Sequence, residues 1–258
     1  MPLTTDDKHS IVGAGYSLWP GLIPAERVRA ALTAINASLG ACGLPPEQLG
    51  RMRAQTFCPE LVGDGPILDL YRATPLAALA EAALGTGRVR APHEAQIALR
   101  FPEPGAAMRD PRPHIDGLPR PDNGVAPGTL YTFTALAAVF LSDADLPFQG
   151  NFTVWPGSHR ALAAHFAAGG SAAVTALGRP DAVFPPVPVA APRQLTVKAG
   201  DALLAHYLLV HGAAANTGPH IRYAVFFRLF HEAHDAHRAP GADAAALAEL
   251  WRDWEGLR

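Results

Sequence analysis

A segment rich in proline and glycine places the firmest limit on what this chain can fold into. Residues 102–128 contain seven prolines and four glycines. Proline has a fixed φ and no amide hydrogen, so this segment cannot be a regular helix or a central strand. The sequence therefore predicts a long irregular connection in the middle of the chain, with regular elements before and after it.

The residues before this connection are predicted to be mainly helical. Apolar side chains recur every three or four positions across residues 24–39, which is the pattern of an amphipathic helix. A second helix is expected over residues 75–84, where a glycine follows the last apolar position. A short helix is also expected near residues 46–51.

Short strands dominate the residues after position 88. Runs rich in β-branched and aromatic residues, bounded by turn residues, predict strands. They are expected at residues 96–101, 129–142, 151–155, 193–197, 202–204 and 222–230. Ser158 is expected to cap a helix that runs to about residue 167. A long loop over residues 169–192, which leaves room for one helix, and an amphipathic C-terminal helix over 242–254 complete the prediction.

Helices first, then several short strands with turn-rich connections, are typical of a helix-flanked antiparallel β-sandwich or jelly roll. A length of 258 residues fits one domain. We expect a mainly helical part over residues 1–87, a jelly-roll core over 88–230, and a tail with a helix over 231–258. A Rossmann fold is excluded because no GxGxxG motif opens a helix.

Charge, the N-terminal residues and the cysteines limit the classes of partner and the location that can be expected. A net charge of −2 gives no general argument for binding nucleic acid or an anionic membrane. The polar N-terminus is unlike a secretory signal, and no apolar run approaches the roughly 20 residues that span a bilayer. Cys42 and Cys58 form no disulfide framework. We therefore expect a cytoplasmic protein with no nucleic-acid or membrane partner, and the oligomeric state stays open.

Three residues have the composition of an iron site. His114 and Asp116 lie two positions apart in the irregular connection, and His211 ends an apolar run. Side chains two apart in an extended segment point the same way, so the first two can face one ion together. Two imidazoles and one carboxylate on one side of an octahedral metal are the ligand set of non-haem Fe(II) oxygenases. The sequence predicts these three residues as metal ligands and catalytic centre.

Arg222 completes the prediction. It opens the last predicted strand, 11 positions after His211, and antiparallel neighbouring strands would bring the two side by side. A buried guanidinium needs an anion, and its fork suits a carboxylate. We expect Arg222 to bind a dicarboxylate co-substrate, 2-oxoglutarate, beside Fe(II) and O2.

The order of these segments resembles the phytanoyl-CoA dioxygenase (PhyH-like) family of Fe(II)/2-oxoglutarate-dependent dioxygenases. A Leu-Ser-Asp step at residues 141–143 ends an apolar strand, and QGNFTVWPGSH follows at 149–159. The distal histidine comes after a Gly-Asp turn at 200–201, with Asn216 five positions after it. The family's Asn-Gly pair reads Gly-Asn here. The resemblance covers about residues 88–230.

The resemblance implies a double-stranded β-helix, a cupin-like jelly roll, with iron near one open end. It implies that 2-oxoglutarate is converted to succinate and CO2 while an unactivated C–H bond of a small or medium-sized metabolite is hydroxylated. Halogenating relatives lack the metal-binding carboxylate, so Asp116 favours hydroxylation over halogenation. Desaturation, cyclisation and epimerisation stay open.

Several further residues are weaker candidates for this site. Gln96 lies 18 positions before His114, where related enzymes place a polar contact to the co-substrate. Thr134, like Thr132 on the same strand face, could donate a hydroxyl to a carboxylate. Three arginines near the predicted metal ligands could bind an acidic substrate or belong to a solvated lid: Arg109, Arg112 and Arg120.

Alternative readings concern the remaining histidines and the fold. Residues 231–237 hold three histidines that could chelate a metal, although a solvated tail is the expectation. His159 and His206 are expected to pack or to support the site. A jelly roll could also be a non-enzymatic cupin-type module that binds a metal or small ligand. A cupin-type isomerase or hydrolase with another divalent ion would not need an arginine such as Arg222.

Overall fold

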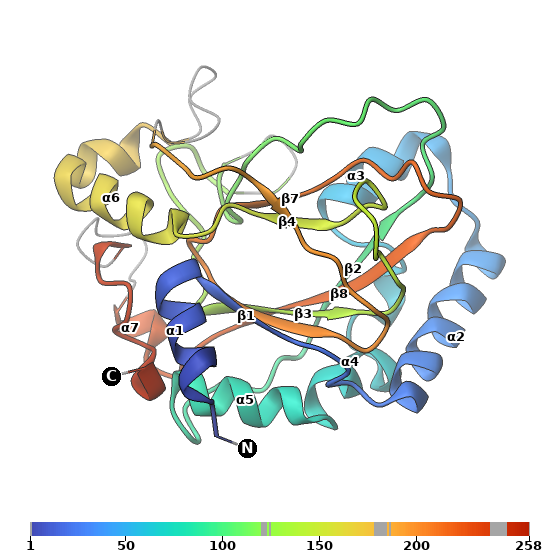
Figure 1. Ribbon diagram of the computed structural model, residues 1–258, viewed down its shortest axis with the longest axis horizontal. Coiled ribbons are helices and arrows are strands. Elements are labelled where there is room, and N and C mark those ends of the chain that lie inside the picture. Colours follow the sequence, from blue (N-terminus) through green and yellow to red (C-terminus); the bar gives the residue numbers. More distant parts are fainter. Residues whose placement is uncertain are drawn as a thin grey trace.

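Two antiparallel sheets form the centre of the molecule (Figure 1). The computed structural model describes residues 2–119, 123, 125–177, 185, 187–237 and 247–257. The larger sheet has the order β1-β6-β3-β8-β2, and the smaller has the order β5-β4-β7. The strands of the larger sheet are β1 (Tyr16–Trp19), β6 (Ala202–His206), β3 (Ala135–Phe140), β8 (Arg222–Leu229) and β2 (Gln96–Arg100). Those of the smaller are β5 (Arg193–Gln194), β4 (Phe152–Val154) and β7 (His211–Ala213). This arrangement confirms the predicted jelly roll.

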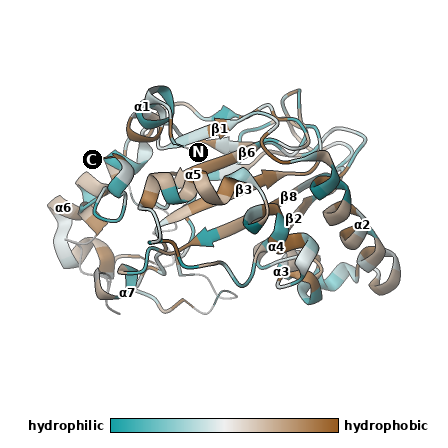
Figure 2. Cartoon of the chain, turned by 90° about the horizontal axis from the view of Figure 1, so that it is seen from below, coloured by the Kyte–Doolittle hydropathy of each residue, from teal (hydrophilic) through white to brown (hydrophobic). Residues whose placement is uncertain are grey.

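Helices cover the outer face of the larger sheet, as Figure 2 shows from below. They come mainly from the N-terminal third: α1 (Thr5–Ala14), α2 (Ala25–Cys42), α3 (Leu49–Ala54), α4 (Gly65–Arg72) and α5 (Pro75–Leu84). Helix α6 (Ser158–Thr175) lies instead at one end of the two sheets, and its buried apolar residues belong to the core between them (Figure 1). The remaining elements are α7 (His234–His237) and the 3-10 turns η1 (Pro46–Gln48), η2 (Pro59–Leu61) and η3 (Glu255–Leu257). Among the described residues, no helix is long and apolar enough to cross a membrane.

The central strand β3 explains how two cores share one sheet. All six of its residues are buried. Leu136, Ala138 and Phe140 belong to the core between the two sheets. The alternate residues belong to a second core, which the sheet forms with helices such as α4 and α5. Because side chains alternate across a strand, an apolar run without polar positions is what a strand covered on both faces requires.

Several predicted boundaries were wrong. β3 begins at Ala135, so residues 129–134 are irregular rather than strand. Helix α6 continues to Thr175 across a kink at Gly170, into the segment predicted as a loop. The N-cap of α6 is Gly157, and the Ser158 hydroxyl instead accepts a hydrogen bond from the amide of Val210.

The predicted C-terminal helix is also wrong where the structure describes it. Residues 247–248 are helical, but 249–254 form turns and an irregular stretch before η3. Residues 242–246 lie outside the described part of the chain. Trp254 is nevertheless buried, and its ring stacks on His206 at 5.6 Å between centroids. Apolar residues at helical spacing reach the core here from turns.

Helices α1 and α4 and strand β1 were not predicted. Both helices carry signals at their first residues. Thr4 and Asp7 form a capping box at the start of α1. Asp64 caps α4, which has a proline in its first turn. The unpredicted strand β1 pairs with β6 at the edge of the larger sheet, from Tyr16 opposite Ala205 to Trp19 opposite Ala202.

Candidate metal centre

Backbone pairing brings the two predicted histidine ligands together. The amide of His114 donates to the carbonyl of His211 at 3.1 Å, and the amide of His211 donates back at 2.9 Å. The irregular connection therefore crosses the start of β7 as an isolated antiparallel bridge. The imidazole centroids lie 4.5 Å apart. Residues almost a hundred positions apart in sequence are thus fixed as direct neighbours.

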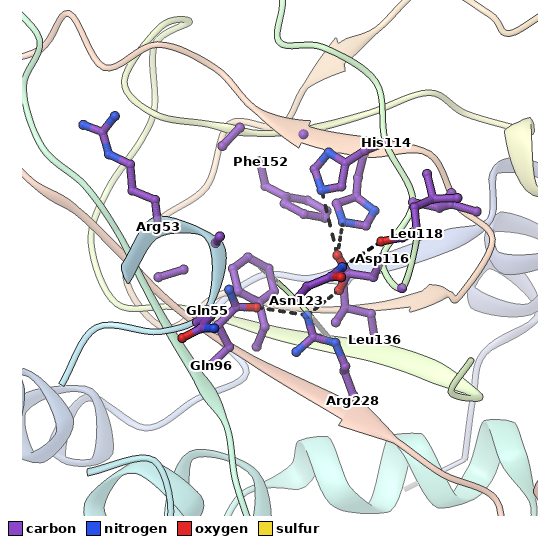
Figure 3. Close-up of a pocket in the computed structure, with 18 of the residues that line it drawn as sticks. Arg53, Gln55, Gln96, His114, Asp116, Leu118, Asn123, Leu136, Phe152 and Arg228 are labelled. Carbon is purple, nitrogen blue, oxygen red and sulfur yellow. Dashed lines mark hydrogen bonds and ion pairs between the residues drawn. The ribbon is translucent and has the colours of Figure 1, made fainter. Parts of the chain in front are cut away.

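Asp116 completes the predicted triad (Figure 3). Its Oδ1 lies 3.8 Å from Nε2 of His114 and 3.5 Å from Nε2 of His211. The chain turns away at Gly117, whose φ is +81° and where a Cβ atom would lie 1.9 Å from the carbonyl oxygen of Tyr131. Ligand atoms bound about 2.1 Å from one ion lie about 3 to 4 Å apart, so these spacings fit a divalent metal.

Hydrogen bonding prepares the His211 imidazole for this role. Its Nδ1 lies 2.9 Å from the carbonyl oxygen of Leu209. A carbonyl oxygen only accepts hydrogen bonds, so Nδ1 carries the proton and donates. Nε2 is then left with its lone pair, on the side that faces Asp116. The ring is buried and lies against Phe152, with 5.3 Å between the ring centroids. His211 is therefore held in the tautomer and orientation of a metal ligand.

The carboxylate of Asp116 is held in its charged form. Burial alone would raise its pKa, but the positive charge of the Arg228 guanidinium lowers it, so that the pKa lies well below its usual range. A metal ligand must be deprotonated, so this environment favours binding of a cation. Within the part of the chain that the structure describes, these three residues are the one group with metal-ligand spacing.

Arg228 is the functional residue that sequence reasoning missed at this centre. Its Nη2 donates to Oδ2 of Asp116 at 2.6 Å and to Oε1 of Gln96 at 3.2 Å. The guanidinium also lies over the ring of Phe133, 5.8 Å from its centroid. Arg228 follows Arg222 by six positions on β8, so the two share a face of the strand. That alternation was visible in the sequence and could have identified it.

The triad opens onto a cavity of about 600 Å³. Gln96 and Arg228 line it beside the metal centre. Further residues in its wall are charged, polar or aromatic: Arg53, Gln55, Glu94, Arg100, Asn123, Tyr131 and Arg222. The cavity therefore joins the predicted metal ligands and the predicted co-substrate anchor in one space.

Arg222 is a buried cation. Only 3% of its surface is exposed, and its Nε donates to the carbonyl of Gly150 at 2.8 Å. Nη1 donates to the carbonyl of Ala98 at 3.1 Å. Burial lowers the pKa of Arg222 to about 9, and the positive charge of Arg100 adds to this. These neutral carbonyls accept hydrogen bonds but leave the charge uncompensated.

Arg100 is a second residue that sequence reasoning missed. It lies directly opposite Arg222 in the register of β2 and β8. Burial also lowers the pKa of Arg100, and nearby Arg53 adds to this. The carboxylate of Glu103 offsets part of this effect on Arg100. Like charges directly opposite on a sheet repel one another. Among the described residues no carboxylate forms an ion pair with either guanidinium, so this end of the cavity is positively charged.

The predicted strand relation between Arg222 and His211 was wrong. β8 belongs to the larger sheet and β7 to the smaller, so the two strands are not antiparallel neighbours. Both residues line the same cavity from different sheets. Gln96, the other predicted polar contact, also lines the cavity, next to Arg228.

The structure does not bring Thr134 to the cavity. Its Oγ1 accepts a hydrogen bond from the amide of His231 at 2.9 Å and lies 3.4 Å from Nδ1 of His234. Thr132 Oγ1 lies 3.2 Å from the other ring nitrogen of His234. Both hydroxyls are thus engaged with the 231–234 segment, and neither threonine lines the cavity. The predicted solvated tail was likewise wrong, because His231 and His234 are both buried.

The remaining predicted residues that the structure describes lie away from the cavity wall. Arg109 and Arg112 are exposed and do not line it. Arg120 lies outside the described residues. His159 and His206 both pack against Trp251. Their ring centroids lie 5.6 Å and 5.2 Å, respectively, from the centroid of the Trp251 ring. Packing is thus the role of these two histidines that the structure supports.

Comparisons with solved structures support the fold. HygX from Streptomyces hygroscopicus, without ligand, aligns at 20% identity over 88% of this chain and 86% of that chain, with a TM-score of 0.55. SnoK, a non-haem α-ketoglutarate-dependent carbocyclase from nogalamycin biosynthesis, aligns at 23% identity over 93% of each chain, with a TM-score of 0.54. EctD from S. alaskensis aligns at 18% identity over 90% of this chain and 78% of that chain, with a TM-score of 0.57.

The comparison by sequence family is more specific. A search of curated proteins gave no match. The family model described as phytanoyl-CoA dioxygenase (PhyH) matches residues 13–224, which includes all three predicted metal ligands and every strand except most of β8. This chain therefore belongs to the PhyH family and is a non-haem Fe(II)- and 2-oxoglutarate-dependent oxygenase.

Proposed function

We propose that this enzyme hydroxylates an unactivated C–H bond of a small, polar metabolite while 2-oxoglutarate and O2 are converted to succinate and CO2. One observation carries the proposal: a triad with metal-ligand spacing and an unneutralised pair of arginines line the same cavity. Bound Fe(II) would supply the activation of O2 and the oxidation of the substrate. The residues of the chain would bind and orient the reactants around it.

His114, Asp116 and His211 would hold the iron. Their ligand atoms all lie within 4.8 Å of one another. The side that faces the cavity is left for the co-substrate, for O2 and for the substrate. A retained carboxylate at Asp116 supports hydroxylation over halogenation.

Arg222 and Arg100 would bind the far carboxylate of 2-oxoglutarate. One carboxylate of a dicarboxylate would supply the anionic partner for these two guanidinium groups. Gly150 allows the close approach, because a Cβ atom there would lie 2.9 Å from Cβ of Arg100 and 3.2 Å from Cβ of Arg222. Gly150 also has a φ of +74°, which glycine adopts without strain. The Gly-Asn order in this segment thus places glycine where the two arginines need it.

The rest of the cavity suits a polar metabolite. A volume of about 600 Å³ lies in the range of sites for drug-sized ligands, so co-substrate and a small substrate can share it. Gln55, Glu94, Asn123 and Tyr131 line it and offer both donors and acceptors. Related structures hold ligands of this kind: EctD was solved with 2-oxoglutarate and 5-hydroxyectoine, and HygX with nickel and 2-oxoglutarate.

The direct test is succinate formation from 2-oxoglutarate by the purified protein, with and without Fe(II). We expect iron-dependent succinate, with further stimulation by a polar metabolite that is a substrate. Mass spectrometry of the product should show the gain of one oxygen atom. A loss of two hydrogens would instead indicate desaturation or the ring closure that SnoK's description names. A metal-binding protein with no affinity for 2-oxoglutarate would contradict the proposal.

A further inference from the structure

We infer that Arg228 is a positioning residue that makes Asp116 a one-oxygen ligand for the metal. The inference rests on the proposed metal centre and goes beyond it, because Arg228 touches neither the metal position nor any of its histidines in the described contacts. It touches the carboxylate oxygen on the other side. Arg228 therefore acts on the metal only through Asp116, so we describe it as a positioning residue and not as a catalytic one.

The two oxygens of Asp116 have different surroundings. Oδ1 faces the imidazoles, 3.8 Å from Nε2 of His114 and 3.5 Å from Nε2 of His211. Oδ2 accepts a hydrogen bond from Nη2 of Arg228 at 2.6 Å. A charge-assisted bond of this length holds Oδ2 away from the imidazoles. The carboxylate can therefore give the metal one oxygen while the other is retained by the guanidinium.

Arg228 is itself held from two further directions. Gln96 on β2 accepts from the same Nη2 at 3.2 Å, and the ring of Phe133 lies beneath the guanidinium at 5.8 Å. A guanidinium has only donors, so the Gln96 atom that meets it must be the amide oxygen. The chain Gln96–Arg228–Asp116 thus links β2, β8 and the irregular connection at one point (Figure 3).

A one-oxygen carboxylate matters for what the metal can bind. A carboxylate that chelates through both oxygens takes one more position on the ion. In this site the extra position would come from those needed for 2-oxoglutarate and O2. Arg228 therefore preserves open positions on the metal, a role distinct from that of Arg222 on the same strand face.

The experiment measures the metal without turnover. Co(II) bound to the whole protein, in the absence of O2, reports its coordination through its visible absorption, and Mn(II) titration gives the affinity. The variants are Arg228→Met, which removes the bond to Oδ2, and Arg228→Lys, which keeps a charged donor. Arg222→Met is the matched control, because it removes an arginine from the same face of β8 without touching Asp116.

We expect Arg228→Met to change the Co(II) absorption spectrum and to weaken Mn(II) binding by about 10- to 100-fold, as loss of a partner to a metal ligand does elsewhere. Arg228→Lys should restore the wild-type spectrum. Arg222→Met should keep both the spectrum and the Mn(II) affinity. Thermal unfolding of each metal-free variant checks that it is folded.

The spectrum of Arg228→Met decides the inference. A spectrum identical to that of the wild type, in a folded protein, would overturn the role of Arg228 and leave the proposed metal centre intact. Failure of the wild-type protein itself to bind Co(II) and Mn(II) would instead overturn the metal centre, and the inference with it. The two failures are therefore distinguishable.

Discussion

Arg222 and Arg228 lie on the same face of β8, six residues apart, in very different surroundings. Arg228 pairs with the carboxylate of Asp116, and its side chain is 31% exposed. Arg222 is 3% exposed and faces a second arginine, with carbonyl oxygens as its acceptors. The difference shows that one strand can place a charge-paired arginine at one end of a cavity and an unpaired arginine at the other.

At the metal end the charges are already arranged before any ligand binds. A guanidinium, a carboxylate and a hydrogen-bonded imidazole hold one another in position. At the arginine end the charges are left unpaired, and the desolvated cations are stabilised only when an anion arrives. The metal end is therefore preorganised to bind a cation, whereas the two arginines are stabilised by binding a dicarboxylate. The predictions below test this contrast.

The largest effect is expected for His211→Ala. It removes one of the three proposed metal ligands at the end of the cavity whose charges are already paired. A bound metal lowers the activation free energy of such reactions by several kcal/mol, and each change of about 1.4 kcal/mol alters the rate tenfold. We expect succinate formation to fall by about 1000-fold or more, together with loss of Mn(II) binding in calorimetry. A variant that retains wild-type metal affinity would remove His211 from the site.

Arg222→Met should affect the other end selectively. Removing one partner of a buried charge pair costs about 2–5 kcal/mol of binding free energy. We therefore expect 2-oxoglutarate to bind about 30-fold more weakly or worse, measured by titration of the Mn(II)-loaded protein. Metal affinity should stay at the wild-type level. Equal loss of both affinities would erase the contrast between the two ends.

Arg100→Met is expected to have two effects of opposite sign. A hydrogen bond to a charged group contributes about 1.5–3 kcal/mol, so 2-oxoglutarate should bind about 10- to 100-fold more weakly. The metal-free and ligand-free protein should become slightly more stable, by a few tenths of a kcal/mol, because a like charge opposite Arg222 is gone. Chemical denaturation measures the second effect. A destabilised variant with normal 2-oxoglutarate affinity would show Arg100 to be a structural residue.

Gln96→Leu should produce a smaller loss. A neutral hydrogen bond contributes about 0.5–1.5 kcal/mol, so removal of the amide should weaken 2-oxoglutarate binding by about 2- to 10-fold if the co-substrate is its ligand. The same titration as above measures it. Unchanged 2-oxoglutarate affinity would assign Gln96 to the support of Arg228 alone.

The smallest effect on the site is expected for Thr134→Val. The hydroxyl accepts a buried backbone hydrogen bond from His231 and lies outside the cavity wall. We expect a loss of stability of about 1–3 kcal/mol, because the His231 amide is left unsatisfied. The affinity for 2-oxoglutarate should not change. Weaker co-substrate binding in a fully folded variant would contradict the position of Thr134 described above.

The sequence predicted which residues come together at the candidate site better than it predicted their neighbours. His114, Asp116 and His211 could be chosen because ligand chemistry and two-residue spacing are local properties. Which strands share a sheet is not local, so the pairing of Arg222 with His211 was wrong and its real neighbour, Arg100, was missed. The same limit hid the contact between Arg228 and Asp116, because alternation along β8 gives a face but not what that face meets.

The central claim is tested most directly by diffraction from crystals of the protein grown without O2 in Fe(II) and 2-oxoglutarate, with data collected at the iron absorption edge. The account predicts one anomalous peak within bonding distance of Nε2 of His114, Oδ1 of Asp116 and Nε2 of His211, and the far carboxylate of 2-oxoglutarate against Arg222. An iron peak elsewhere, or 2-oxoglutarate bound away from Arg222, would contradict it.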